Sequence, residues 1–187
     1  LCAQVLLTWD DFDKRSRFLN AKNTLLELIR KEVIPIINEN DTVSVDEIRF
    51  GDNDKLSSLV AGLINADLLV ILSDVDGLYK DKKENLITVV EDITMQIERL
   101  ACGTDKSVCV GGMSTKIEAC RMTNSLGIPC VIANGHTKGV LLKIVNKESV
   151  GTIFLPKLKS KSAKKQWILQ GTKPKGRIFV DDGAKEA

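Results

Sequence analysis

The chain is poor in the residues that carry acid–base and zinc chemistry. Its 187 residues include one histidine, His136, and five cysteines without a C-x-x-C pair. A zinc site is therefore not expected, and neither is a metal site built from a cluster of protein side chains. We expect His136 to lie in a turn, and Cys120 and Cys130, which stand in apolar runs, to be small buried side chains. The cysteine pattern is typical of the cytoplasm.

A long apolar run and a secretory leader are also missing. No stretch approaches the roughly 20 apolar residues that cross a bilayer, so we expect no membrane association. The first residues, Leu1–Leu7, lack a charged leader and a cleavage site, and the chain has no initiating methionine. We therefore expect it to come from the middle of a longer protein. Its content of 43% hydrophobic and 28% charged residues is that of an ordinary globular protein.

The charge is distributed unevenly along the chain. The formal net charge is +2, yet residues 157–177 hold eight basic side chains and no acidic one. We interpret residues 1–156 as the main domain, 157–165 as a basic linker and 166–187 as the beginning of a β-rich module. A solvated linker explains the basic run, and contact with RNA or another polyanion is the alternative.

Short apolar runs alternate with helical patterns over residues 1–156. The runs predict strands at 3–7, 33–37, 68–72, 87–90, 128–133 and 151–155. The patterns predict helices at 18–31, from 54 onward, and at 92–100, 112–126 and 140–145. Leu68–Leu72 are apolar without alternation, which is typical of a strand buried on both faces of a parallel sheet. This order predicts an α/β fold, a three-layer α/β/α sandwich around a mainly parallel open sheet.

Four polar clusters follow or lie near apolar runs. Loops at the carboxyl ends of parallel strands converge on one crevice. Asp, Asn, Gly, Ser and one Lys are the groups needed to hold a magnesium-bound polyphosphate beside a small polar acceptor. Taken singly, each cluster also suits an ordinary turn or a helix cap, but together they predict phosphoryl transfer. The clusters are Asn38–Asp41, Gly51–Asp54, Ser73–Gly77 and Gly111–Lys116.

Gly111–Lys116 is the most specific of the four. Two glycines allow backbone amides to approach phosphate oxygens, and the helix that follows presents free N–H groups. Lys116 can reach a transferring phosphoryl group and stabilise the charge that builds there. The spacing is not that of a P-loop, G-x-x-x-x-G-K-[ST]. The alternative is a Gly-Gly turn before a helix with a surface lysine.

The other clusters supply groups for the two substrates. Asn53 can bond a substrate carboxylate or ammonium, and Asp54 can orient Lys116 or magnesium. Asn38–Asp41 offers acceptors for an ammonium and donors for a carboxylate. Ser73–Tyr79 follows the most apolar run, which is a natural place to hold a nucleotide.

These segments resemble the glutamate 5-kinase branch of the amino acid kinase family. The likeness extends over essentially the whole chain, and the asparagine-rich cluster together with Gly51–Asp54 points to that branch. The segments that carry it are Pro35–Thr42, Phe50–Asp54, Ser73–Tyr79, Gly111–Lys116, Val131–Gly135, Gly151–Pro156 and Asp181–Ala184.

The resemblance implies ATP-dependent phosphorylation of the side-chain carboxylate of L-glutamate, the first step of proline biosynthesis, with Mg²⁺ carried by ATP. It implies that Asn38, Asp41 and Asn53 bind glutamate. Lys116 is then the catalytic lysine and Asp54 organises it. The implied ATP-binding residues are Ser73, Asp74, Val110, Gly111, Gly112, Met113, Ser114, Thr115 and Lys116.

The ends of the chain depart from the family pattern. The family begins with a strand and a glycine-rich loop that carries a second phosphate lysine, followed by a Ser-Gly segment that binds substrate, and this sequence contains neither. The tail from about Lys164 resembles the start of a PUA domain, a module associated elsewhere with RNA. We therefore expect the 187-residue chain to be inactive or very weak by itself.

Two other functions stay open. One is another acid kinase, acting on N-acetylglutamate or aspartate. The other is a catalytically silent protein that binds a nucleotide, or RNA through the basic tail. For the kinase we expect ATP and L-glutamate as partners and a homo-oligomeric assembly.

Overall fold

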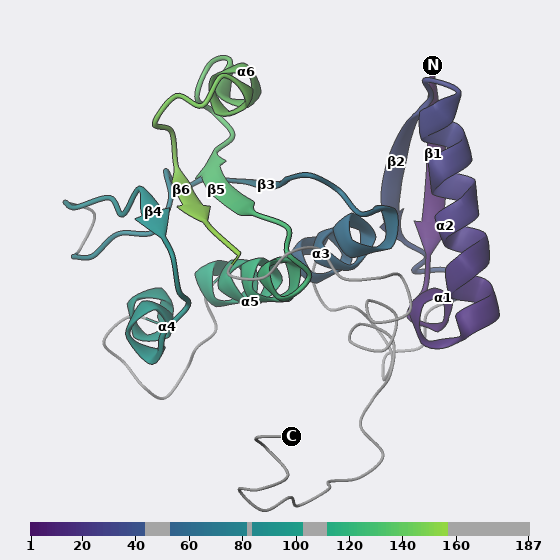
Figure 1. Cartoon of the computed structure of the whole chain (residues 1–187), viewed down its shortest axis with the longest axis horizontal. Helices are drawn as coiled ribbons and strands as arrows, with labels where there is room; N and C mark the ends of the chain where they lie inside the picture. Colours follow the sequence, from purple (N-terminus) through teal and green to yellow (C-terminus); the bar gives the residue numbers. More distant parts are fainter. Residues whose placement is uncertain (44–52, 82–83, 103–111, 157–187) are drawn as a thin grey trace, which may run out of the picture.

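The computed structural model describes residues 1–43, 53–81, 84–102 and 112–156. The predictions for Val110, Gly111 and residues 157–187 lie outside this part of the chain. Figure 1 shows the order of the elements. They are β1 (Cys2–Leu7), α1 (Asp10–Asp13), α2 (Arg15–Arg30), β2 (Ile34–Glu39), α3 (Asn53–Ile64), β3 (Leu69–Ser73), β4 (Val89–Val90), α4 (Met95–Cys102), α5 (Gly112–Ser125), β5 (Cys130–Asn134), α6 (Val140–Val145) and β6 (Thr152–Phe154).

The helices follow the apolar spacing of the sequence. Phe18 and Leu25 are the buried residues of α2, which begins three residues before its predicted start. Helix α5 ends at Ser125, one residue before its predicted end, and Gly127 follows with φ +84°, a left-handed conformation that glycine adopts without strain. Within the described ranges, no helix is both long and apolar enough to span a membrane.

The described strands form two sheets, whereas the sequence predicted one open sheet. β1 pairs with β2 in parallel, and a four-stranded sheet has the order β3-β5-β6-β4. Within the second sheet β5 and β6 are antiparallel, and the other pairs are parallel. Pairing is thus mainly parallel, as predicted. Helix α3 lies between the two sheets and contacts both β2 and β3 (Figure 1).

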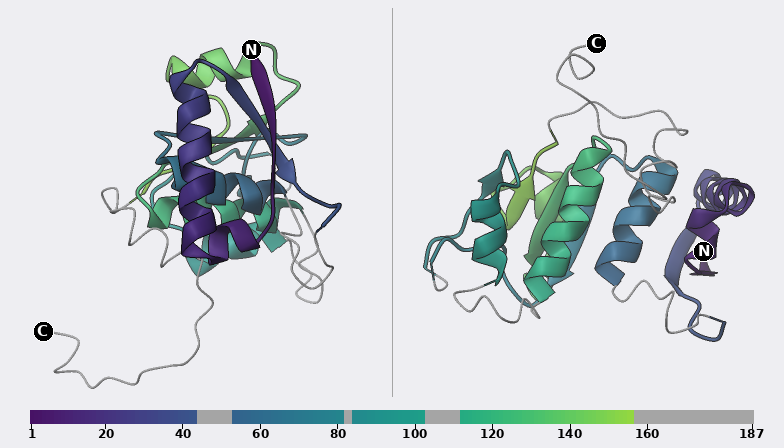
Figure 2. Two further views of the ribbon diagram at one scale, coloured as in Figure 1. Left: turned by 90° about the vertical axis from the view of Figure 1, so that its right-hand side faces the viewer. Right: turned by 90° about the horizontal axis from the view of Figure 1, so that it is seen from below.

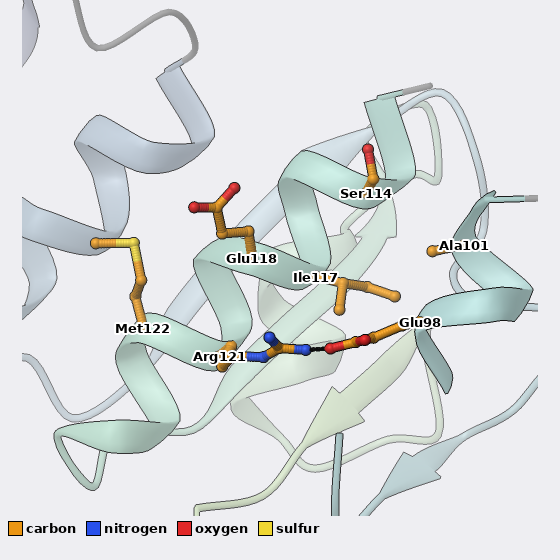
Figure 3. Close-up of a pocket in the computed structure, with 7 residues that line it drawn as sticks. All are labelled: Glu98, Ala101, Ser114, Ile117, Glu118, Arg121 and Met122. Atoms are coloured by element: carbon orange, nitrogen blue, oxygen red, sulfur yellow. Dashed lines mark ion pairs between the residues drawn. The ribbon is translucent and has the colours of Figure 1, made fainter. Parts of the chain in front are cut away.

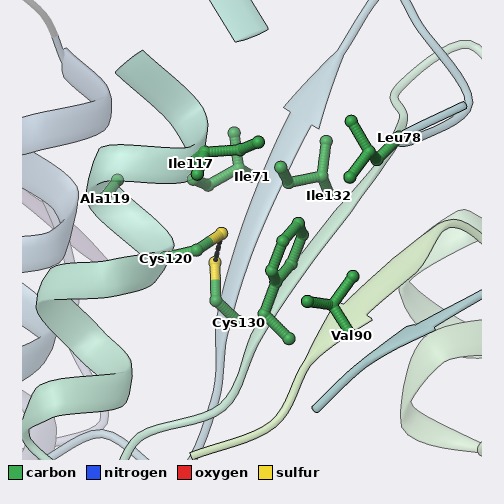
Figure 4. Close-up of a cluster of buried hydrophobic side chains, with 9 residues drawn as sticks. Ile71, Leu78, Val90, Ile117, Ala119, Cys120, Cys130 and Ile132 are labelled. Carbon is green, nitrogen blue, oxygen red and sulfur yellow. Dashed lines mark hydrogen bonds between the residues drawn. The ribbon is translucent and has the colours of Figure 1, made fainter. Parts of the chain in front are cut away.

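Helices cover both faces of the four-stranded sheet. On one face, Ile117 and Cys120 of α5 pack against Ile71 and Ile132, and α4 packs against the same cluster (Figure 4). On the opposite face, Val140 of α6 packs against β5. This part of the molecule is the predicted α/β/α sandwich.

Strand β3 is less buried than its apolar run predicted. Ile71 faces α5 and is 5% exposed, whereas Leu72 on the other face is 45% exposed. Side chains of a strand alternate between faces, so Leu72 points to the side of α6. On that face of the sheet α6 packs on Val131 and Ala133 of β5 and leaves Leu72 of β3 exposed. The prediction that β3 is buried on both faces is therefore wrong.

Cys120 and Cys130 are small buried side chains, as predicted. Both are fully buried, and the Cys120 thiol donates to Cys130 Sγ across 2.9 Å (Figure 4). Burial raises the pKa of the Cys120 thiol above its usual value, because the core does not solvate a thiolate. The Cys120 thiol therefore remains neutral, and its contact with Cys130 joins α5 to β5 as part of the core.

We predict that Gly151→Ala destabilises the fold far more than Gly139→Ala. Gly151 has φ +77°, and an added Cβ would meet the carbonyl oxygen of Ile132 and lie 2.9 Å from Ala133 Cβ. Gly139 has φ +70° but nothing within 4 Å of an added Cβ. We expect losses of about 3 kcal/mol or more at Gly151 and about 1 kcal/mol at Gly139. Urea unfolding measures both, and equal losses would contradict the packing described here.

Candidate functional site

An ion pair joins the N-terminal turns of α3 and α5. Asp54 is the second residue of α3, and Lys116 is the fifth of α5. Lys116 Nζ donates to Asp54 Oδ2 at 2.8 Å, and the two side chains are only 15% and 13% exposed. The two helices lie side by side (Figure 2), so the pair bridges them directly. Its partial burial makes the attraction stronger than that of a surface pair.

The start of α5 has the properties of an anion site. Its first backbone N–H groups have no partner within the helix, and no acidic residue stands in its first turn. A Cβ added at Gly112 would lie 3.9 Å from Lys116 Nζ, so the ammonium reaches back over the helix start. The ammonium therefore lies beside the positive end of the α5 helix dipole, which suits a phosphate.

Thr115 contacts the same carboxylate as Lys116. Its Oγ1 lies 3.0 Å from Asp54 Oδ2 and 3.0 Å from the carbonyl oxygen of Gly112. The sequence placed Thr115 among the nucleotide-binding residues but did not reveal its contact with Asp54. That contact depends on how α3 and α5 pack, and no local pattern encodes it.

Two predicted residues, Ser73 and Asp74, lie at the carboxyl end of β3. Ser73 Oγ donates to Asp74 Oδ1 at 3.1 Å, and Asp74 is exposed. Ser73 pairs with Asn134 of the parallel strand β5, and Gly135 N donates to the Ser73 carbonyl oxygen at 2.8 Å. The loops after β3 and β5 therefore leave the sheet at the same edge.

Asp76 connects these two loops. It accepts hydrogen bonds from Asn134 Nδ2 at 2.9 Å and from the Tyr79 hydroxyl at 2.7 Å. The backbone N–H of His136, which lies in a turn as predicted, donates to Asn134 Oδ1 at 2.9 Å. Asp76 and Asn134 lie in two of the segments that carry the family resemblance, Ser73–Tyr79 and Val131–Gly135, but no role was predicted for either residue. The sequence did contain one signal for their contact: Asp76 follows the β3 run and Asn134 ends the β5 run, and these two strands pair in parallel.

A buried threonine holds the loop after β3 through two hydrogen bonds to its backbone. Thr152 of β6 is fully buried, its Oγ1 donates to the Ile87 carbonyl oxygen at 2.6 Å, and it accepts from Leu78 N at 2.8 Å. Leu78 belongs to the cluster against which Met113, in the first turn of α5, also packs. The loop and the start of α5 are thus held by one core.

The predicted substrate residues lie near the end of β2 and the start of α3. β2 extends to Glu39, so Asn38 is an exposed strand residue rather than part of the loop predicted to follow the strand. Asp41 is exposed in the turn that follows, and Asn53 is the exposed first residue of α3. Ile37 of β2 packs against the cluster that contains Leu56 of α3. A shared core therefore supports both segments.

A hollow of about 440 Å³ lies between α4 and α5. Figure 3 shows Arg121 of α5 pointing to Glu98 of α4, with which it forms an ion pair, and Ser114 at the end nearer the helix start. The start of α5 therefore has this hollow on its α4 side and the Asp54 carboxylate on its α3 side. The hollow is lined by Glu98, Ala101, Ser114, Ile117, Glu118, Arg121 and Met122.

Residues 1–134 match the model of the amino acid kinase family, and the chain belongs to that family. It is 52% identical to the glutamate 5-kinase of Carboxydothermus hydrogenoformans, over 100% of this chain and 51% of that protein. The glutamate 5-kinase of Geobacter metallireducens is 50% identical, over 98% of this chain and 50% of that protein. The chain thus spans about half the length of the curated relatives it matches.

Solved structures with a similar fold are more distant in sequence. The carbamate kinase from Giardia lamblia bound to AMP-PNP superposes with a TM-score of 0.58 at 20% identity, over 82% of this chain and 61% of the other. The isopentenyl phosphate kinase of T. acidophilum gives a TM-score of 0.52 at 17% identity, over 82% and 58%. These similarities support the fold.

We predict that Tyr79 titrates above its usual pKa of 10.0. The hydrogen bond to Asp76 raises this pKa most, because ionisation would remove the donated proton and place two negative charges together. The resulting stabilisation is present below the unfolded pKa and is lost as pH rises through the folded one. Tyr79 is the single tyrosine, so near-ultraviolet tyrosinate absorbance reports it directly.

Asp76→Ala should bring the Tyr79 pKa back toward its usual value. Tyr79→Phe is the control and should remove the titration altogether. An unchanged pKa in Asp76→Ala would show that the hydrogen bond does not govern it.

Proposed function

We propose that the protein containing this chain transfers the γ-phosphoryl group of ATP to the side-chain carboxylate of L-glutamate. The product is γ-glutamyl phosphate, and the reaction is the first step of proline biosynthesis. The observation that carries the proposal is the Lys116 ammonium, held by Asp54 beside the N-terminal turn of α5. The similarity to proteins named glutamate 5-kinase, over the full length of this chain, supports the same acceptor.

Lys116 and the start of α5 act on the phosphates in this proposal. Lys116 has three N–H donors and gives one to Asp54, so others can face an equatorial oxygen of the transferring group. Charge builds on those oxygens in the transition state, where a fixed ammonium lowers the barrier. Gly112, Met113 and Ser114 present backbone N–H groups, with Val110 and Gly111 before them. Magnesium arrives as part of the MgATP substrate.

Ser73 and Asp74 contact the nucleotide in the same scheme. They stand at the carboxyl edge of β3, where ligands of open α/β sheets bind. Asp76, Asn134 and Thr152 hold this loop in place through the hydrogen bonds described above.

The acceptor needs little chemical activation. Its carboxylate is already ionised at neutral pH, so no general base is required, and catalysis reduces to alignment and charge stabilisation. We propose that Asn53 and Asn38 donate to this substrate and that Asp41 accepts from its ammonium. A free α-amino group needs such an anionic partner, which favours glutamate over N-acetylglutamate. We also propose a homo-oligomer located in the cytoplasm.

The reaction can be tested by trapping its product with hydroxylamine. The assay uses the protein at the full length of its curated relatives, with MgATP and one acceptor at a time. We expect hydroxamate with L-glutamate and not with N-acetylglutamate or aspartate. Hydroxamate with one of those acceptors instead would indicate another acid kinase. If no acceptor reacts although the protein binds ATP, the binding-protein alternative is favoured.

We predict that Lys116→Met lowers kcat by on the order of a thousandfold, because it removes the ammonium that stabilises the transition state. The matched control is Lys31→Met, which removes an exposed lysine whose partner, Glu27, lies 3.6 Å away at the end of α2. It should retain the original kcat. Circular dichroism checks that both variants fold, and a folded Lys116→Met protein with normal kcat would refute the assignment.

A further inference from the structure

We propose that Thr115 is a positioning residue that acts through Asp54 to fix the Lys116 ammonium during phosphoryl transfer. This inference rests on the proposed function and assigns Thr115 a role different from nucleotide binding. Asp54 Oδ2 accepts hydrogen bonds from Lys116 Nζ at 2.8 Å and from Thr115 Oγ1 at 3.0 Å. One carboxylate oxygen is thus held by two adjacent residues of α5.

The Thr115 proton is directed mainly to the carboxylate. A hydroxyl has one proton to donate, and two acceptors lie at 3.0 Å, Asp54 Oδ2 and the Gly112 carbonyl oxygen. The ionised carboxylate is the stronger acceptor, so the bond to Asp54 is charge-assisted. Contact with Gly112 keeps the same hydroxyl close to the start of α5.

Lys116 alone would not fix Asp54. Its ammonium is a rotatable group on a flexible stem of four carbons, and an aspartate carboxylate turns easily about its last torsion. The Thr115 hydroxyl is joined to the α5 backbone through a single side-chain torsion, χ1, which has only a few staggered positions. Its hydroxyl locates Asp54 Oδ2 relative to the α5 backbone, and the carboxylate in turn locates the ammonium. A displacement of that ammonium would weaken transition-state stabilisation more than substrate binding.

Another threonine provides a matched control. Thr24 of α2 is exposed, and its hydroxyl donates to the Asn20 carbonyl oxygen at 2.9 Å within its own helix. Thr24→Val therefore removes a hydroxyl–backbone contact like that between Thr115 and Gly112, without a carboxylate partner. Thr115→Ser keeps the hydroxyl and loses only the methyl group.

The kinetic test uses the full-length protein, with kcat and KM measured for ATP and for L-glutamate. We expect Thr115→Val to lower kcat by about 10- to 100-fold, the effect of a lost hydrogen bond to a charged group. Both KM values should change by less than about threefold. Thr115→Ser should recover most of the kcat, and Thr24→Val should match the original protein. Normal kcat in Thr115→Val, or equal losses in the Val and Ser variants, would overturn the inference.

A double-mutant cycle tests whether Thr115 acts through Asp54. In an Asp54→Asn background, adding Thr115→Val should have little further effect on kcat, whereas fully multiplicative effects would overturn the inference.

Urea unfolding of the same four proteins gives a readout that does not need turnover. We expect the double variant to lose less than the sum of the two single losses. If the original protein forms no hydroxamate, the proposed function fails, while this coupling still decides whether Thr115 holds Asp54.

Discussion

The ion pair between Asp54 and Lys116 requires α3 and α5 to lie side by side with their N-terminal turns in contact. A partly buried charge is costly without its partner, so each of the two residues depends on the packing that presents the other. That packing continues along the helices, where the fully buried Ser58 of α3 lies 3.4 Å from Met122 Sδ of α5. Asp54 stands in the first turn of α3, whereas the first turn of α5 contains no acidic residue. The positive end of the α5 dipole can therefore attract an anion.

A second constraint is the parallel pairing of β3 with β5. It places Ser73 and Asn134 at one edge of the sheet, and the loops that follow are joined there through Asp76. Thr152 satisfies the buried N–H of Leu78 and the partly buried carbonyl oxygen of Ile87. The core that contains Leu78 also packs against Met113, so the loop after β3 and the start of α5 share one core.

Much of this arrangement could be predicted from local sequence. The apolar spacing of α2 and α3, the stop at Gly127 and the helix at Val140–Val145 each depend on neighbouring residues. The candidate residues could also be identified from the sequence, because Gly-rich, Asp-rich and Asn-rich segments after apolar runs supply the groups that hold a polyphosphate and a polar acceptor. The burial of β3 was predicted wrongly because burial depends on which helix covers a strand. Here α6 covers β5 and leaves Leu72 45% exposed.

The amino-acid sequence by itself determined the types of element, the position of the glycine-rich segment at the start of α5 and the identity of Lys116 and Asp54 as candidates. Only the tertiary structure decided that Asp54, Thr115 and Lys116 meet, that Asp76 joins two loops, and that the strands divide into two sheets. The physical reason is the range of the interactions. Helix periodicity and turn chemistry act over a few residues, whereas these contacts link residues about sixty positions apart and arise from packing.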